Sequence, residues 1–343
     1  MNNNAAILSA FNLDANQCLI EKTSTGLINQ TFIVSDTISS KRFILQKVNT
    51  SIFKNPIAIS ANIKLASACI LAVDEDYPVI KTNQTIKDED YFIDDQNCYW
   101  RLIDFIENTT TIDSISTVDQ AYQTAYSFGK FTSLLQNANT ENFIPSIPDF
   151  HNLDLRFEEF KTAYANTDEE RKAKAKDYID YLLSRIEIVT IFKNIESEKL
   201  IPKRIIHADT KISNILFDAH SFHPKAVIDW DTIMPGYFIS DLGDMIRTMV
   251  CETGENETNL DNIVFRKDYY EAIISGYKDA IQLTENELNL LSYAGKFMTY
   301  MQALRFLTDY LNHDVYYNIT YPEQNLDRAK NQCRLLQVLE ENI

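Results

Sequence analysis

Two short motifs near the middle of the chain restrict its fold more than any other feature. The first is the stretch His207-Ala-Asp209-Thr-Lys-Ile-Ser-Asn214, an H-x-D-x-x-x-x-N pattern, and the second is an apolar run that ends at Asp229. The spacing between Asp209 and Asn214 allows one tight loop to place a carboxylate and an amide close together. Asp229, at the end of a neighbouring strand, can then reach the same point. Phosphoryl transfer from ATP needs one carboxylate as base and an Asn and a carboxylate for Mg²⁺. The alternative is that His207 caps a loop and the other three are turn residues.

Length, composition and charge exclude several classes of protein. A chain of 343 residues suggests two domains or two lobes of one enzyme, and 45% hydrophobic residues allow sizeable cores. With 32 basic against 49 acidic residues, the net charge of -17 argues against a nucleic-acid binder and against an anionic membrane surface. No apolar run reaches the length of about 18 residues that a membrane span needs. The N-terminus, without basic residues, does not resemble a signal peptide.

The five cysteines, at positions 18, 69, 98, 251 and 333, form no C-x-x-C pair. This spacing excludes a metal knuckle and a redox motif. An odd number of cysteines in a chain of this length indicates reduced, buried thiols and a cytoplasmic protein.

The distribution of strand-like and helical patterns predicts two different halves. Short β-branched and aromatic runs at 18–22, 31–34, 42–48, 91–93 and 98–106, with helical spacing at 57–73, predict a five-stranded antiparallel sheet with one helix. After Asn108 the pattern becomes helical. Capping boxes that begin at Thr117, Thr167 and Thr284 predict three helix starts.

Segments 45–56, 207–218, 227–236, 241–247 and 304–311 resemble the kinase-like aminoglycoside/choline phosphotransferase superfamily, and most closely the bacterial N-acetylhexosamine 1-kinases. The resemblance implies an α+β, two-lobed protein-kinase-like fold. Residues 1–106 would form the nucleotide-binding lobe, and residues 107–343 a larger, mainly helical lobe for catalysis and acceptor binding.

The resemblance also implies roles for residues of the two motifs. Asp209 would be the catalytic base, and Asn214 and Asp229 would bind Mg²⁺. His207 would brace the loop. Lys211 could neutralise charge on the transferred phosphoryl group, with a solvent-exposed lysine as the alternative.

Asp241 and Asp244 resemble the acidic pair that follows the metal site in this superfamily. For Asp241 this implies a structural role. A helix N-cap is the alternative interpretation of Asp241.

The expected nucleotide site departs from the protein-kinase pattern. The stretch 23–31, with Gly26 and Asn29, resembles the strand–loop–strand that covers nucleotide phosphates, although it has one glycine. On the next strand Gln46 takes the position of the phosphate-binding lysine, while Lys47 points to the opposite face because side chains alternate.

The helix at 57–73 lacks the partner glutamate, so both halves of the expected Lys–Glu ion pair are missing or displaced. Backbone groups near Phe105 and Ile106 would bind adenine.

On the acceptor side, Arg305, Tyr316 and Tyr317 resemble the sugar-contacting part of the sugar-kinase pattern. The alternatives are a helical ion pair between Arg305 and Asp309 and tyrosines buried in the core. The expected function is an ATP- and Mg²⁺-dependent kinase of the anomeric hydroxyl of N-acetylglucosamine or N-acetylgalactosamine. The rivals are a kinase of an aminoglycoside, homoserine-like amino acid or amino alcohol, and a catalytically silent nucleotide-binding regulator.

Overall fold

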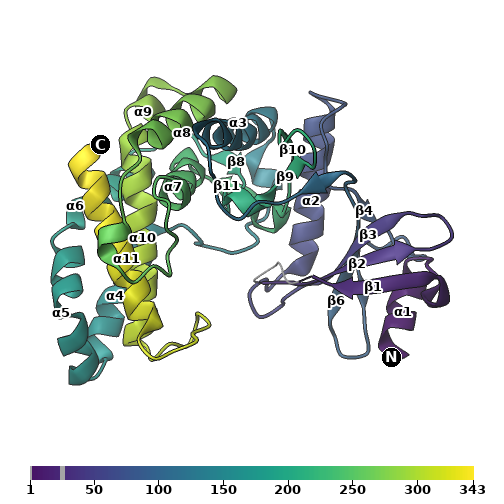
Figure 1. Ribbon diagram of the computed structural model, residues 1–343, viewed down its shortest axis with the longest axis horizontal. Coiled ribbons are helices and arrows are strands. Elements are labelled where there is room, and N and C mark those ends of the chain that lie inside the picture. The colour runs from purple at the N-terminus through teal and green to yellow at the C-terminus, as the bar shows by residue number, and fades with distance from the viewer. Residues whose placement is uncertain (1, 24–27) are drawn as a thin grey trace. The chain divides into compact units, whose positions relative to one another are not determined.

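The computed structural model describes residues 2–23 and 28–343, which form two compact units (Figure 1). Unit 1 comprises Met1–Thr110, Asn137–Pro148 and Leu216–Met234, and unit 2 comprises Thr111–Gln136, Asp149–Ile215 and Pro235–Ile343. The first break between the units lies close to the predicted boundary at 106. Unit 1 also takes two later segments, and the second of these carries Asp229.

An antiparallel sheet dominates unit 1, as predicted. Its strand order is β1-β2-β3-β6-β4, and β5 pairs with β6. The strands are β1 (Cys18–Lys22), β2 (Gln30–Asp36), β3 (Arg42–Lys47), β4 (Thr82–Asn83), β5 (Phe92–Ile93) and β6 (Tyr99–Asp104). The short β4 is an addition to the five predicted strands.

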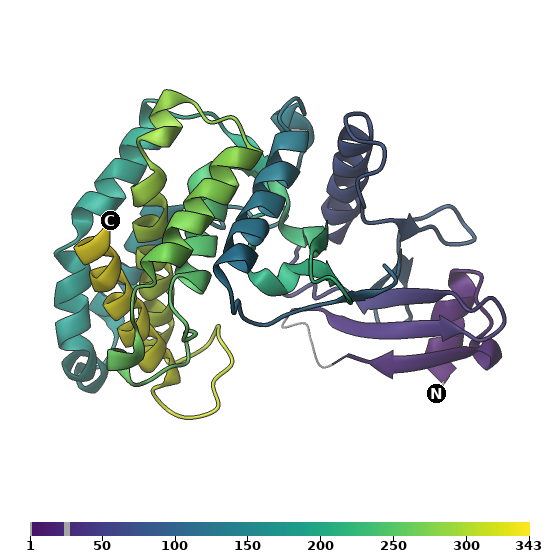
Figure 2. The ribbon, with the colours of Figure 1, turned by 45° about the horizontal axis from the view of Figure 1, so that its top comes forward.

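A helix that the sequence patterns did not reveal, α1 (Asn2–Ala10), covers one face of this sheet (Figures 1 and 2). Ile7 and Leu8 of α1 pack with Val34, Leu45 and Leu102 of the strands in one buried apolar cluster. This burial explains why α1 is stable despite its polar start, because apolar area removed from water contributes about 25 cal/mol per Å².

The predicted helix of unit 1 is α2 (Pro56–Leu71). Its start is set by Asn55, whose side chain accepts a hydrogen bond from the backbone N–H of Ala58, and by Pro56 in the first turn. The buried Asn62 donates from Nδ2 to the carbonyls of Ile144 and Ile233, at 2.7 and 3.0 Å. These bonds connect α2 to the two later segments of unit 1.

A small second sheet completes unit 1, with the strand order β10-β9-β7. It contains β7 (Thr109–Thr110), β9 (Ile215–Asp218) and β10 (Pro224–Val227), and the 3₁₀ turn η4 (Trp230–Thr232) follows it. Asp229 lies between β10 and η4.

Unit 2 is mainly helical, as expected, and its long α10 (Leu291–Leu311) packs against α4, α7 and α11 (Figure 2). Its other helices are α3 (Val118–Leu134), α4 (Leu153–Asn166), α5 (Glu169–Leu183), α6 (Ile186–Ser197), α7 (Phe238–Met249), α8 (Lys267–Ala280), α9 (Glu285–Leu288) and α11 (Gln324–Asn342). The strand β8 (Arg204–Ile206) pairs with β11 (Met234–Gly236).

Gly243 allows α7 to approach α10 closely. A Cβ at this position would lie 2.3 Å from the carbonyl oxygen of Ala294, which is shorter than any real contact. The close packing holds the first two turns of α7, with Asp241 and Asp244, in place.

Two of the three predicted capping boxes are confirmed, at Thr117 before α3 and Thr284 before α9. The prediction at Thr167 is wrong: the N-cap of α5 is Asp168, whose side chain accepts from the N–H of Arg171. Thr167 instead ends α4. Asp caps a helix as well as Thr does, so the two neighbours could not be distinguished by residue type.

All five cysteines are free thiols. Cys251 and Cys333 are buried as expected, whereas Cys18, Cys69 and Cys98 are partly exposed. In the described part of the chain, we find no helix with the length and apolar character needed to cross a membrane.

Candidate active site

In unit 2 the first motif forms one compact loop after β8. Asp209 Oδ2 accepts hydrogen bonds from Lys211 Nζ at 2.8 Å and from Asn214 Nδ2 at 3.0 Å. Asn214 Nδ2 also donates to the backbone carbonyl of Asp209 at 2.9 Å. The structure therefore brings together three of the predicted residues, with the Asp209 side chain 25% exposed and within reach of a ligand.

The electrostatics of the loop keep Asp209 ionised. Burial alone would raise the pKa of this carboxyl, but Lys211, His207 and the Asn214 amide together hold it below its usual value. A carboxylate that stays ionised can accept a proton over a wide pH range. Lys211 is thus partnered with Asp209, while its side chain is 35% exposed.

Asp241 holds the backbone of this loop. Its two carboxylate oxygens accept hydrogen bonds from the N–H groups of His207 at 2.9 Å and Ala208 at 2.8 Å. The N-cap interpretation of Asp241 is wrong, because α7 begins after Tyr237 and Asp241 lies within its first turn. Asp244 Oδ2 accepts from the N–H of Thr210 at 3.1 Å.

Burial raises the pKa of Asp241 to about 6, although His207 and the two backbone hydrogen bonds act to lower it. Ala208 has a φ of 64°, in the left-handed region that costs a residue with a Cβ about 1–2 kcal/mol. The bonds from Asp241 offset this strain.

His207 Nδ1 accepts from the N–H of Asp209 at 3.3 Å, and its ring contacts Phe128 and Phe131 edge-on.

The predicted metal ligands belong to different units, Asn214 to unit 2 and Asp229 to unit 1. The Asn214 amide donates two hydrogen bonds from Nδ2, and its Oδ1 is the atom suited to a cation. Asp229 also has left-handed backbone angles, φ 63° and ψ 55°. Such angles in a non-glycine residue are a frequent feature of functional sites.

An amide oxygen and a carboxylate are both oxygen ligands of the kind that Mg²⁺ takes. Within residues 2–23 and 28–343 there is no group of three or more His, Cys, Asp or Glu that could hold a metal ion. Mg²⁺ beside a nucleotide usually has one or two protein ligands and takes the rest from phosphates and water.

In unit 1, Gln46 lies in a buried hydrogen-bond network that contains an arginine. Arg101 of β6 donates to Gln46 Oε1 from Nε at 3.0 Å and from Nη2 at 2.7 Å. Arg101 Nη2 also lies 2.6 Å from Asp231 Oδ1 in an ion pair. Asn29 Nδ2 donates to Asp231 Oδ2 at 2.7 Å.

The side chain of Lys47 lies outside this network, with its ammonium 6.0 Å from the centre of the Trp100 ring. Gln46 and Lys47 therefore lie on opposite faces of β3, as the alternation of side chains predicts. Gly26 falls in residues 24–27, outside the described residues.

Phe105 and Ile106 follow β6 in unit 1. The N–H of Phe105 donates to the carbonyl of Arg42 at 3.2 Å, and the carbonyl of Ile106 accepts from Thr109 Oγ1 at 2.7 Å. The guanidinium of Arg42 lies over the Phe105 ring at 4.0 Å. These contacts leave the carbonyl of Phe105 and the N–H of Ile106 as the groups suited to a purine edge.

On the acceptor side, Arg305 of α10 contacts three aromatic rings. Its guanidinium lies 5.4, 5.8 and 5.7 Å from the ring centres of Phe150, Tyr316 and Tyr317. Arg305 Nη1 donates to Gln302 Oε1 at 3.3 Å. In the described part of unit 2 it has no carboxylate partner within ion-pair distance.

The alternative ion pair between Arg305 and Asp309 is wrong, because Asp309 is used elsewhere. Its carboxylate accepts from the backbone N–H groups of Val315, Tyr316 and Tyr317 at 2.8–3.0 Å, which fixes the loop after α10. Tyr316 is 56% exposed and so is not a core residue, whereas Tyr317 is half-buried and receives a hydrogen bond from Gln302 Nε2.

His151 is a candidate that the motifs did not reveal. Its ring stacks on Phe150 at 4.4 Å, and Nδ1 is buried without a hydrogen-bond partner among the described residues. Burial, and then the charge of Arg305, lower the pKa of His151 to about 3, while Asp209 opposes the shift. A neutral imidazole in this position is suited to a hydroxyl group.

The sequence analysis did not predict the network residues Arg101 and Asp231, although each has an unusual sequence context. Arg101 is a charged residue inside an otherwise strand-like run, and Asp231 is the second acid of the motif that contains Asp229. Buried charges require partners, so each of them could have suggested the other.

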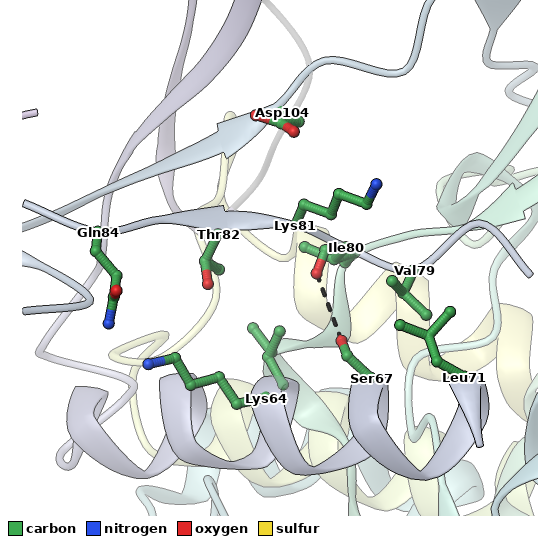
Figure 3. A pocket seen from close by; sticks show the side chains of 10 residues that line it. Lys64, Ser67, Leu71, Val79, Ile80, Lys81, Thr82, Gln84 and Asp104 are labelled. Atoms are coloured by element: carbon green, nitrogen blue, oxygen red, sulfur yellow. Dashed lines mark hydrogen bonds between the residues drawn. The ribbon is translucent and has the colours of Figure 1, made fainter. Parts of the chain in front are cut away.

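A cavity of about 530 Å³ lies between α2 and β4 in unit 1 (Figure 3). Ile63, Leu71, Val79 and Ile80 give it an apolar wall, and Lys64 and Lys81 reach its rim. None of Asn29, Gln46 and Arg101 lines it, so this hollow is separate from the candidate nucleotide residues.

Three solved structures are similar to this chain over almost all of its length. An aminoglycoside phosphotransferase from Alicyclobacillus acidocaldarius subsp. acidocaldarius has 12% identity and a TM-score of 0.64, over 98% of this chain and 95% of that chain. A microcompartment-associated aminopropanol kinase has 15% identity and a TM-score of 0.63, over 98% and 96%. A spectinomycin phosphotransferase solved with ADP and spectinomycin has 14% identity and a TM-score of 0.63, over 99% and 98%.

Identities this low show a shared fold and do not transfer a substrate. The sequence itself also matches a family model, that of the phosphotransferase enzyme family, over residues 20–273. This match covers most of the chain and includes both motifs. The chain therefore belongs to the phosphotransferase enzyme family.

Proposed function

We propose that this phosphotransferase is an ATP- and Mg²⁺-dependent kinase of a small, neutral, hydroxylated molecule, and that the acceptor is an N-acetylhexosamine phosphorylated at its anomeric hydroxyl. Asp209 accepts the hydroxyl proton while the acceptor oxygen bonds to the γ-phosphorus and the bond to ADP breaks. Asn214 and Asp229 hold Mg²⁺, which when bound offsets the negative charge on the β- and γ-phosphates. Lys211 adds a positive charge beside the same carboxylate.

The remaining predicted residues take the roles that their places suggest. The carbonyl of Phe105 and the N–H of Ile106 bind the adenine edge. Asn29 contributes to binding the phosphates together with Gln46 of β3, and the same role is proposed for Gly26, which lies outside the described residues. His207 and Asp241 position the loop and do not touch substrate.

The observation that carries the proposed acceptor class is the environment of Arg305. A guanidinium without a carboxylate partner, surrounded by aromatic rings and a glutamine, suits a ligand that offers oxygen acceptors and an apolar ring face. An acetamido sugar has both. Neutral His151 adds a group that can bond a hydroxyl.

A cationic acceptor would need acidic groups that are free to meet it. Four carboxylates of unit 2 already have partners: Asp241 and Asp244 in the 207–214 loop, Asp309 in the loop after α10, and Glu255 in Arg247. This argues against an amino alcohol or an aminoglycoside, although relatives of the same fold are named for aminopropanol and spectinomycin.

A catalytically silent regulator remains the second candidate, and its support is the missing Lys–Glu pair. The connected Asp209, Lys211 and Asn214 favour catalysis instead, because a protein that only binds nucleotide has no need of a positioned base.

The test is release of ADP with Mg·ATP and a panel of acetamido sugars, free sugars, amino alcohols and aminoglycosides. We expect turnover with an acetamido sugar, and an Arg305→Ala variant that loses roughly one to two decades of kcat/KM for that sugar while its KM for ATP is unchanged. The matched control is Arg185→Ala, which removes another guanidinium that lies over a tyrosine ring, that of Tyr181 at 4.7 Å.

Turnover with cationic acceptors alone would contradict the proposed acceptor class. Binding of Mg·ATP without turnover on any member of the panel would support the regulator. If Arg305→Ala kept wild-type sugar kinetics, Arg305 would be excluded from the acceptor site.

A further inference from the structure

We propose that Arg101 supplies the positive charge that meets the nucleotide phosphates, in place of a lysine on β3. The inference rests on the proposed ATP-dependent function and adds a residue to it. Protein kinases place the corresponding lysine on the third strand and pair it with a glutamate of the helix that follows. Here Gln46 occupies that strand position and α2 has no glutamate.

The register of the sheet places Arg101 directly beside the substituted position. Gln46 of β3 is the antiparallel partner of Arg101 of β6, and both side chains meet on the same face. Gln46 Nε2 donates to Thr31 Oγ1 at 3.1 Å on β2. The positive charge that β3 lacks is therefore present on the neighbouring strand β6. Gln46 accepts hydrogen bonds from Arg101 and donates one to Thr31 of β2.

Arg101 is also tied to the two segments that the proposed function assigns to phosphates and metal. Asp231, which pairs with it, lies two residues after Asp229, and Asp231 also accepts from Asn29, next to the segment that precedes β2. The side chains of Arg101 and Asp231 are 4% and 3% exposed. Asp231 thus takes the place of the missing glutamate as the partner of the cation.

The arginine retains an unused hydrogen-bonding group. Nε and Nη2 bond to Gln46 and pair with Asp231, whereas Nη1 is buried and has no acceptor among the described residues. Buried N–H groups of a charged side chain are rarely left without a partner. A phosphate oxygen supplies the acceptor that Nη1 lacks, and a guanidinium matches phosphate geometry well.

The test compares the dissociation constants of Mg·ATP and of adenosine, which has no phosphates, by calorimetry on three variants of the full chain. Arg101→Gln should weaken Mg·ATP binding at least tenfold and leave adenosine binding unchanged. Asp231→Asn removes the opposing charge and keeps Arg101, so Mg·ATP binding should stay equal or become tighter. Arg101→Gln with Gln46→Lys returns the charge to β3 and should restore Mg·ATP affinity.

The control is Arg204→Gln, which breaks a bidentate, mostly buried pair with Glu287 in unit 2. It should lower the melting temperature without changing either dissociation constant. If Arg101 were only structural, Arg101→Gln and Asp231→Asn would lower Mg·ATP and adenosine binding together, as any loosening of unit 1 would. That outcome, or unchanged Mg·ATP binding in Arg101→Gln, would overturn the inference.

If Arg101→Gln does not fold, the double variant Arg101→Gln with Gln46→Lys provides the test. A folded double variant that binds Mg·ATP tenfold more weakly than wild type contradicts the inference. The wild-type protein separates this inference from the proposed function. If it binds Mg·ATP and turns over but Arg101→Gln does so equally, only the inference fails. If the wild type does not bind Mg·ATP, both fail.

Discussion

Replacing Asp209 with asparagine tests the centre of the proposed mechanism. The change keeps the size of the side chain but removes the charge that pairs with Lys211 and the capacity to accept a proton. General-base catalysis contributes about 10²–10⁴-fold, so kcat should fall by that factor, equivalent to about 3–5 kcal/mol of transition-state stabilisation. The affinity for Mg·ATP should stay within a factor of about three.

The structure predicts that this loss is chemical and not a loss of folding. The Lys211–Asp209 pair is 35% and 25% exposed on its two side chains, and such pairs contribute about 0–1 kcal/mol. The loop is held mainly by Asp241, through the N–H groups of His207 and Ala208, and these bonds do not involve the Asp209 side chain. The melting temperature should therefore change by a few degrees at most.

The assay is ADP release at saturating acceptor, together with calorimetry for Mg·ATP and a thermal melt. Asp218→Asn is the matched control, because Asp218 lies at the end of β9 and its side chain accepts hydrogen bonds from His220 and Ser221 of the following turn. Its kcat should equal that of the wild type. A variant of Asp209 that keeps more than about a tenth of the wild-type kcat would refute the base assignment. Parallel losses of kcat, nucleotide affinity and melting temperature would refute the claim that the effect is chemical.

Three further predictions use the same methods. Asp229→Ala should weaken Mg²⁺ and ATP binding together by at least about tenfold in calorimetry, because Asn214 would remain as a lone neutral ligand; unchanged binding would exclude Asp229 from the metal site. Lys47→Ala should leave the KM for ATP unchanged, since its ammonium lies near the Trp100 ring, and a tenfold rise would contradict this. The pKa of Asp241 rises from 3.8 to about 6 on folding, so its contribution to the free energy of unfolding is present below about pH 4 and is lost as the pH rises through 6. In urea titrations, the free energy of unfolding of Asp241→Asn should not show this decrease between pH 4 and 6. An unaltered decrease would show that another group causes it.

Much of the fold could be predicted because local rules decide it. The apolar and aromatic residues at 18–22 and 42–48 favour strands locally. Thr117 and Gln120, the third residue of the helix, satisfy free backbone groups at the start of α3 without help from distant parts of the chain. The α1 helix was missed because its stability comes from burying Ile7 and Leu8 against strands far along the chain. Patterns within nine residues do not contain that information.

The proximity of the polar residues in the 207–214 loop could be predicted for the same reason. Asp209, Lys211 and Asn214 lie within six residues of one another, so a single tight loop brings them together whatever surrounds it. The role of Asp241 was not readable, since an acid in a first helical turn is equally consistent with a cap. Only the packing of α7 decides that its carboxylate meets the N–H groups of residues 207 and 208.

Short spacings in the sequence are enough to predict that the acid, amide and lysine of the 207–214 loop lie together. Which charged side chains pair with one another depends on the packing of segments far apart in the chain. Asp309 accepts hydrogen bonds from the backbone of residues 315–317, and Arg305 has no acid partner among the described residues. Asp231 pairs with Arg101 from 130 residues away. Ion pairs over such separations depend on how the chain packs, and no local pattern can specify them.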